Sequence, residues 1–368
     1  MTADVTPRWV ATDSSGYIIA ALPSLIPDGS LRRTMGRYES QTFQLVVTDK
    51  TDPSWLAATR EGAGAVIGYV GEPGDERVVW GGIVLRRERG LDNRVKLTAV
   101  TPEGYLDGRY TGDYSVTGRD QNLIMSDLIG KAAAGHPSAA GSSGWPFTVR
   151  IVGGAGTARD RTYADKDDKT LYSALDDLAG AEGGPQWMTG WEWQHNPERI
   201  VATATVGTRV GVAKTAGLSA PVSFTSRMMT AAAHVSDYSP GNGGNVVTAV
   251  SSGEGDARPQ QSAGVYQPGR PVWEVRFTPS TSITNTATLL GHARARLGTI
   301  ANGSQVVSCT LARAAAPRLG IDWDLGDDAT VTIDGPLFAS PITTTAQVVG
   351  YDIDADTITP YLAQDGGF

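Results

Sequence analysis

Residues that could carry acid–base, nucleophilic or metal chemistry are few and scattered in this 368-residue chain. No two of the four histidines stand at metal-ligand spacing from each other or from a cysteine; they are His136, His195, His234 and His292. Cys309, the single cysteine, cannot form an intrachain disulfide, and its alternation with polar neighbours predicts a small buried apolar residue. The glycine-rich stretch 153–157 lacks the Lys-Ser/Thr ending of a phosphate loop. We therefore predict no catalytic residue, no metal, no cofactor and no enzymatic activity.

Three acidic clusters were weighed as metal sites. The stretch 165–168 begins like a calcium loop, but Thr170 stands where that loop needs glycine and Asp176 where it needs glutamate. The clusters at 322–328 and 352–356 fall in expected turns, where aspartate is favoured for backbone reasons. Turn formation and helix capping are therefore the preferred interpretation of all three clusters.

Three tryptophans are the candidate contact residues, namely Trp187, Trp191 and Trp193. Indole rings can stack on sugars, which would give a glycan-binding surface. Alternation at Trp191 and Trp193 also places both rings on one face of a strand, in a core or a subunit interface. Both interpretations stay open, so the three tryptophans are candidate glycan or interface contacts.

Composition points to a globular, turn-rich protein. Hydrophobic residues make up 40% and charged residues 19% of the chain, and 45 glycines with 20 prolines favour strands and turns over a helical bundle. The net charge of −8 argues against general affinity for nucleic-acid backbones, so no specific nucleic-acid binding is expected. The longest apolar run, Tyr17 to Leu22, is far below the ~20 residues of a membrane span, and no signal peptide is expected.

The clearest local pattern is a β-hairpin over residues 79–97. Alternation through Ile83 and Leu85 and again through Val95 and Leu97 predicts two strands, and 90–93 supply the turn. Gly81-Gly82 suggests a bend or a close backbone approach. The polar, basic tip is expected to be exposed.

Three helices are expected between the strands. The first spans about 120–134, with Asp120 as N-cap. The second follows a cap at Asp168 and buries Leu171, Leu175 and Leu178. The third spans about 284–297 and is closed by Gly298.

These elements predict an α+β, mostly β protein: two antiparallel β-barrels and an α+β module with a few short helices. The first barrel is assigned to residues 1–108. The α+β module takes 109–205 and, as its second part, 257–317. The second barrel begins at 206–256 and closes with 318–368, a stretch that resembles the first barrel as a degenerate repeat.

The order of elements resembles one protein family. A strand barrel is followed by the connection Tyr105 to Arg109, a helix with small residues and an amphipathic helix at Leu171 to Ala179. Trp-rich strands and the helix at 284–297 come next, and the stretch Asp322 to Asp327 then precedes the closing strands. This succession resembles the hub proteins of phage tail tips and baseplates, including the N-terminal region of tail-associated proteins of long-tailed phages. The resemblance covers nearly the whole chain and carries no catalytic residues.

The resemblance implies two tail-tube-like barrels per subunit and a homotrimer whose pseudo-sixfold ring continues the tail tube. It implies a structural virion protein made in the host cytoplasm and located at the distal tail end. Expected partners are further copies of the chain, the distal tail or tail tube protein, the tape measure protein and other tail-tip or fibre proteins. DNA would pass through the ring without specific binding. The alternatives are a receptor- or glycan-binding tail protein and a tail-associated cell-wall hydrolase.

Overall fold

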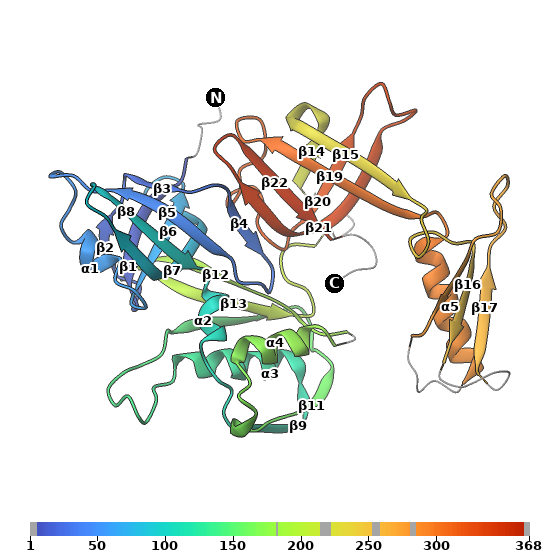
Figure 1. The fold of residues 1–368 in the computed structure, drawn as a ribbon, viewed down its shortest axis with the longest axis horizontal. Coiled ribbons are helices and arrows are strands. Elements are labelled where there is room, and N and C mark those ends of the chain that lie inside the picture. Colours follow the sequence, from blue (N-terminus) through green and yellow to red (C-terminus); the bar gives the residue numbers. More distant parts are fainter. Residues whose placement is uncertain (1–5, 182, 214–221, 252–257, 280–284, 364–368) are drawn as a thin grey trace. The chain divides into compact units, whose positions relative to one another are not determined.

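The computed structural model describes residues 6–181, 183–213, 222–251, 258–279 and 285–363 (Figure 1). The protein is mostly β, with 47% of its residues in strands and 16% in helices, and it includes a sheet curled into a half-barrel. This agrees with the predicted α+β, mostly β class, whereas the two separate barrels stay a prediction. The chain divides into two compact units: residues 1–230 with 310–362, and residues 231–309 with 363–368.

The first sheet of unit one has seven strands in the order β2-β1-β6-β7-β8-β5-β3, all paired antiparallel. Their bounds are β1 Arg8–Asp13, β2 Ile18–Ala21, β3 Leu25–Pro27, β5 Ser40–Val46, β6 Gly64–Val70, β7 Arg77–Arg89 and β8 Arg94–Val100. The short helix α1, Trp55–Ala58, precedes β6. β7 and β8 form the hairpin predicted from the sequence, with Val95 and Leu97 buried as expected.

Aromatic rings fill one side of this sheet. Phe43 packs edge-on against Trp9 and Trp80, with ring centroids 5.0 and 5.2 Å away. The predicted close approach at Gly81 is confirmed, because a Cβ there would lie 2.5 Å from Cδ1 of Trp191. The glycine therefore lets the ring of a later strand lie directly on the first sheet.

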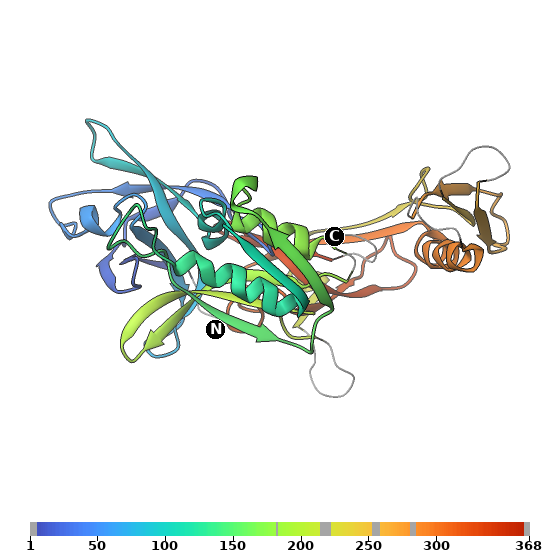
Figure 2. The same cartoon turned by 90° about the horizontal axis from the view of Figure 1, so that it is seen from below.

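A second layer combines helices with two small sheets. The strand orders are β10-β13-β12 and β11-β9. The strands are β9 Tyr114–Asp120, β10 Phe147–Val152, β11 Ala158–Tyr163, β12 Gln186–His195 and β13 Glu198–Gly207; the helices are α2 Pro102–Asp107, α3 Gln121–Gly130, α4 Leu171–Ala179 and the 3₁₀ helices η1 Lys131–Ala133 and η2 Asp165–Asp167. Helices α3 and α4 pack side by side over a core that includes Leu128, Leu175 and Trp187 (Figure 2).

Helix capping confirms one prediction and corrects another. Asp120 caps α3 by accepting a hydrogen bond from the Asn122 amide, as predicted. Asp168 does not cap α4. It ends η2 in the left-handed conformation, and the hydroxyl of Thr170 accepts from the Ser173 amide instead. Threonine offers a side-chain acceptor nearer to the helix start, so it satisfies the free N–H group.

The second large sheet has the order β14-β20-β21-β22-β19-β15, and β4 also pairs with β21. The strands are β4 Leu31–Thr34, β14 Val222–Thr225, β15 Met229–Asp237, β19 Ser304–Ala312, β20 Asp328–Ile333, β21 Ile342–Ile353 and β22 Thr357–Leu362, and the 3₁₀ helix η3, Ser226–Met228, follows β14. The expectation of a wholly antiparallel arrangement is wrong at one pair, since β14 and β20 run parallel. Parallel strands need a long crossover, and about a hundred residues separate these two.

The described residues of unit two form a small sheet and a helix, together with most of β15 and β19. The sheet order is β17-β16-β18, with β16 Val246–Val250, β17 Gln260–Gly264 and β18 Glu274–Phe277. Helix α5, Thr286–Ile300, packs Leu289 and Ala293 against this sheet. The predicted end at Gly298 is wrong, because the helix continues to Ile300. Residue 284 lies outside the described residues, and Asn285 is the N-cap.

Candidate functional site

The most distinctive construction in unit one is the joint between its two large sheets. Strand β4 follows β3 of the first sheet along the chain, yet it pairs with β21 of the second, with Leu31 opposite Ile353 (Figure 1). The indole N–H of Trp80 donates to the carbonyl of Arg32, at 3.1 Å. Four residues early in the chain thus become part of a sheet whose other strands come from residues 222–362.

An ion pair fixes this crossing strand. The Arg32 guanidinium donates to both carboxylate oxygens of Asp352, each at 2.8 Å, and the Tyr361 hydroxyl donates to the same carboxylate. Burial alone would raise the pKa of Asp352, but hydrogen bonds from Arg32 and Tyr361 outweigh it and hold that pKa below its usual value. A bidentate arginine–carboxylate pair also fixes the relative orientation of the two side chains, so it helps to specify the register of β4 on β21.

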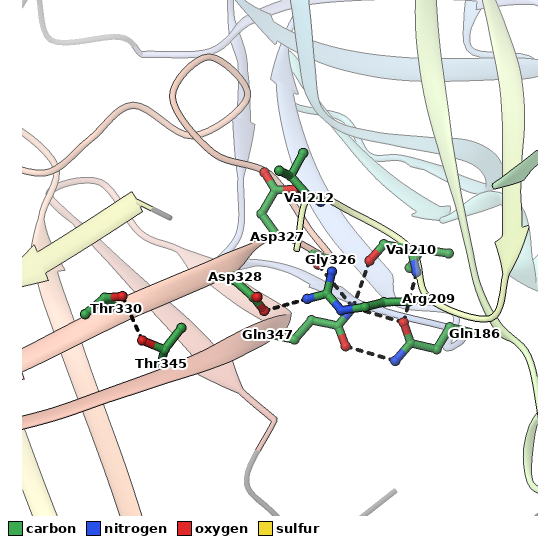
Figure 3. A network of polar contacts seen from close by, with 10 residues as sticks. All are labelled: Gln186, Arg209, Val210, Val212, Gly326, Asp327, Asp328, Thr330, Thr345 and Gln347. Atoms are coloured by element: carbon green, nitrogen blue, oxygen red, sulfur yellow. Dashed lines mark hydrogen bonds and ion pairs between the residues drawn. The ribbon is translucent and has the colours of Figure 1, made fainter. Parts of the chain in front are cut away.

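A second set of polar contacts joins β12 and the segment after β13 to the second sheet (Figure 3). The buried amide of Gln347 donates to Gln186 Oε1 at 3.0 Å and to the carbonyls of Val210 and Gly326 at 2.9 and 3.1 Å. The Gln186 side-chain amide in turn donates to Gln347 Oε1, at 2.9 Å. This exchange satisfies backbone carbonyls that would otherwise be buried without partners.

Two glycines and two aspartates complete that joint. A Cβ on Gly211 would lie 2.1 Å from the carbonyl carbon of Gly326, so the two backbones touch only because neither residue has a side chain. Arg209 pairs with Asp328 at 2.5 Å, and Asp327 accepts from the Val212 amide at 2.7 Å (Figure 3). The contacts give the two sheets of unit one a single, well-specified arrangement.

The outer end of the β7–β8 hairpin is a basic, exposed surface. In Figure 2 this blue-green hairpin extends beyond the rest of its sheet. Residues 85–96 carry five basic and two acidic side chains, on a chain with a net charge of −8. Leu91 at the tip is fully exposed, and Leu85 is 56% exposed. The outer part of the hairpin therefore presents two exposed leucines among basic side chains.

The three predicted tryptophans lie on one strand, β12, but in different surroundings. Trp187 is buried in the core of the helical layer. Trp191 is buried against the first sheet, and Trp193 is half-buried with its ring 4.7 Å from that of Tyr69. Glycan or interface contact by these residues stays a prediction.

A polar groove of about 280 Å³ runs along β12 within unit one, and both Trp191 and Trp193 line it. Three basic and three acidic side chains also line it: Arg33, Arg77, Arg150, Glu76, Glu192 and Asp324. Asp324 is an exposed residue by its surface area, although protein atoms are packed densely around its carboxyl group. Burial raises the pKa of its carboxyl to about 6, against the lowering effects of the Leu325 amide and the Arg33 charge.

Sequence reasoning missed the joint entirely. Arg32 and Asp352 are 320 positions apart, and neither stands in a recognisable motif. Gln347 lies in an ordinary strand pattern, and nothing local distinguishes it from an exposed glutamine. The sequence did mark the acidic clusters that contain Asp327, Asp328 and Asp352, but it predicted turns there, whereas Asp352 lies in β21 and pairs with Arg32.

The other residues considered for chemistry are placed as follows. Cys309 is 2% exposed, as predicted, and burial raises the pKa of its thiol to about 11. His136 and His195 are exposed. Among the residues that the structure describes, no three histidine, cysteine or acidic side chains are grouped to hold a metal ion.

Among the described helices, none has the length and apolar character needed to cross a membrane.

Comparison with known proteins gives matches by structure alone. The fold is similar to the 43 kDa tail protein of prophage MuSo2 from Shewanella oneidensis, with a TM-score of 0.55 and 12% identity over 97% of this chain and 98% of that one. It is similar to a tail protein from Neisseria meningitidis MC58, with a TM-score of 0.53 and 14% identity over 98% and 97% of the two chains. It is also similar to a chain of the half-lidded Francisella PdpA–VgrG complex, with a TM-score of 0.53 and 8% identity over 99% of this chain and 58% of that one.

No family model and no curated protein matches the sequence. At these identities the likeness is one of fold: the chain has the fold of prophage tail proteins over its full length.

Proposed function

We propose that this chain is a structural tail protein of a phage or prophage, and that it forms the hub at the tail tip. The observation that carries this proposal is the fold likeness to two tail proteins, one of them from a prophage, which extends over 97% or more of both chains in each comparison. Likeness over both full lengths supports a shared architecture rather than one shared domain. We assign no catalytic role to any residue.

The hub would be a homotrimer that continues the tail tube. Each subunit carries two large sheets, one within residues 1–108 and one closed by residues 318–368. If each sheet occupies one position of a sixfold ring, three subunits supply six positions, which adapts sixfold to threefold symmetry. The β4–β21 joint supports this proposal, because such a subunit needs its two sheets in a fixed arrangement.

The acidic balance of the chain suits a channel for DNA. A net charge of −8 disfavours the release of counterions that drives binding to phosphates, so DNA could pass without being retained. The protein would then be located at the distal end of the virion tail, after synthesis in the host cytoplasm.

We propose the β7–β8 hairpin as a contact surface for the next tail component. Its basic residues complement acidic protein surfaces, and its exposed leucines supply apolar area. The partners proposed are further copies of this chain, the distal tail or tail tube protein, the tape measure protein and other tail-tip or fibre proteins.

Sedimentation velocity tests this proposal. The purified chain should form a species of three times the chain mass, or a larger complex that contains three copies when a tail tube protein is added. Arg89→Glu with Arg94→Glu should weaken the association with the tube protein and leave the fold intact. Arg227→Glu, outside the hairpin, is the matched control. A chain that stays monomeric with and without the tube protein would contradict the trimer.

A further inference from the structure

The loop between β17 and β18, residues 265–273, presents large apolar side chains to solvent. Tyr266 is 87% exposed and Val272 is 69% exposed, and Val265 and Trp273 are each 43% exposed. Single exposed apolar residues are ordinary in folded proteins, but four of them within one short loop are not. If these side chains lie together, they form a surface that another molecule is expected to cover.

Asn245, directly before β16, holds the two ends of this loop together. Its carbonyl accepts a hydrogen bond from the Val265 amide at 2.9 Å, and its side-chain oxygen accepts one from the Trp273 amide at 2.8 Å. Its side-chain amide donates to the Pro271 carbonyl at 3.0 Å. The two apolar pairs of the loop, one at each end, are therefore tied to the same residue and form one patch.

The C-terminal end of α5 fixes the middle of the loop. The carbonyl of Ala301, the C-cap residue, accepts hydrogen bonds from three side chains: Gln267 at 2.8 Å, Arg270 at 3.0 Å and Tyr238 at 3.2 Å. The Arg270 guanidinium also lies over the Tyr238 ring, 4.1 Å from its centroid. Such donors, one of them cationic, satisfy the free carbonyl and interact favourably with the helix dipole. The loop is therefore preorganised, which lowers the entropy cost of binding a partner.

The polar side chains of the loop are used to build it. Gln267 donates to Asn302 Oδ1 at 3.1 Å as well as to the end of α5, and it accepts from Arg270 at 2.8 Å. A sugar site needs such amide groups for the ligand's hydroxyl groups, and here they are engaged within the protein. The loop presents outward an aliphatic and aromatic surface beside one guanidinium. This composition fits a protein partner, since Trp, Tyr and Arg are enriched in protein–protein hot spots.

The charge around the patch favours a partner with carboxylates. Residues 265–273 contain no acidic residue, and residues 231–309 carry five arginines and four acidic residues, so the negative balance of the chain comes from its other residues. Arg270 is exposed, and its hydrogen bonds to the described residues come from one terminal nitrogen. The rest of its guanidinium can therefore pair with a carboxylate. The other residues of this same chain supply an acidic surface of that kind.

We propose that the 265–273 loop docks on a second copy of this chain, on an acidic and apolar surface outside residues 231–309. Apolar side chains of the second copy would cover Tyr266 and Val272, and one of its carboxylates would pair with Arg270 at the edge of the patch. The inference rests on the proposed homotrimer and names a contact that holds its copies together. It is independent of the β7–β8 hairpin, which is proposed to contact the next tail component.

Photo-crosslinking of the purified full chain tests this contact directly. Benzoylphenylalanine in place of Tyr266 keeps an aromatic ring in the patch, and an equal mixture of isotope-labelled and unlabelled chains separates contacts between copies from contacts within one. Crosslinks should join labelled to unlabelled chains and should fall outside residues 231–309. The same probe in place of Arg294, an exposed residue of α5, is the matched control and should not give these crosslinks.

Sedimentation velocity gives the second measurement. Tyr266→Ala with Val272→Asp should raise the dissociation constant of the assembly about tenfold or more, because the patch loses apolar contacts and the new aspartate faces carboxylates. Arg270→Gln should weaken the assembly less, and Arg294→Gln should leave it unchanged. Circular dichroism of each variant shows whether it is folded. If the double variant fails to fold, the crosslinks decide.

The proposal is overturned by crosslinks confined to one chain or to residues 231–309, by crosslinks only to an added tail tube protein, or by the absence of crosslinks. It is also overturned if the folded double variant associates as the wild type does. A trimer that persists in that variant leaves the hub proposal intact. A wild-type chain that stays monomeric with and without the tube protein contradicts the hub itself.

Discussion

Tyr351 shows at the residue scale how the joint is held. Its hydroxyl, on the second sheet, donates to the carbonyl of Val79 on the first at 2.9 Å, and the side chain is 2% exposed. Its ring also contacts Trp323 edge-on, 6.0 Å between centroids. One side chain thus contributes both packing and a hydrogen bond between strands that are 272 positions apart.

Tyr351→Phe should lower the free energy of unfolding by about 1–2 kcal/mol, because it leaves the buried Val79 carbonyl without its donor. Urea unfolding of the wild type and variant measures this difference. Tyr17→Phe is the control, since Tyr17 is 46% exposed. Equal losses in the two variants would show that the buried hydroxyl contributes nothing.

Asp324 gives a prediction for pH. Burial raises its folded-state pKa from the usual 3.8 to about 6, so the folded state holds a proton that the unfolded state has released. The contribution of this group to stability is therefore largest below pH 3.8 and is lost as pH rises towards 6. Asp324→Asn, which stays neutral, removes this dependence.

Urea midpoints of the wild type and Asp324→Asn between pH 4 and neutral pH provide the check. The stability of the wild type relative to the variant should fall over that range. Two curves that stay parallel would show that the carboxyl has an ordinary pKa in the folded protein.

At the scale of elements, the sequence correctly predicted those structures that interactions between nearby residues stabilise. The β7–β8 hairpin, the Asp120 cap and the buried faces of α3 and α4 each depend on residues within a few positions of one another. The α4 cap was misplaced by two residues because aspartate and threonine both cap well and only backbone geometry separates them. Gly298 did not end α5, since an interior glycine costs only about 1 kcal/mol.

The β4–β21 pairing could not be predicted from the sequence, for a different reason. A strand of four residues has no periodicity of its own to assign, and its partner lies more than three hundred positions away. Arg33 is buried and Gln347 is 8% exposed, although both types are mostly found on surfaces. Their roles come from tertiary neighbours alone, so the joint and the groove emerge only with the fold.

Gln347 tests the joint as an element. Gln347→Ala should lower the free energy of unfolding by about 2–3 kcal/mol, because Gln186 and the carbonyls of Val210 and Gly326 share the two N–H groups of this amide and would lose both. Gln44→Ala, at an exposed position of β5, is the matched control and should change stability little. Chemical unfolding gives both values. A loss no larger than that of the control would mean that the Gln347 amide contributes no net stability to the joint.

At the scale of the whole molecule, the proposed ring requires each subunit to hold its two large sheets in a fixed arrangement. The sheets of unit one are tied by β4, by the Arg32–Asp352 pair and by the Gln186–Gln347 exchange. The fold is that of prophage tail proteins over the full chain.

Electron microscopy of the purified chain with the tail tube protein, followed by two-dimensional class averages, tests the central claim most directly. The account predicts threefold rings with a central hole, seated at the end of a tube. Particles that contain single copies, or rings of another symmetry at the tube end, would contradict it.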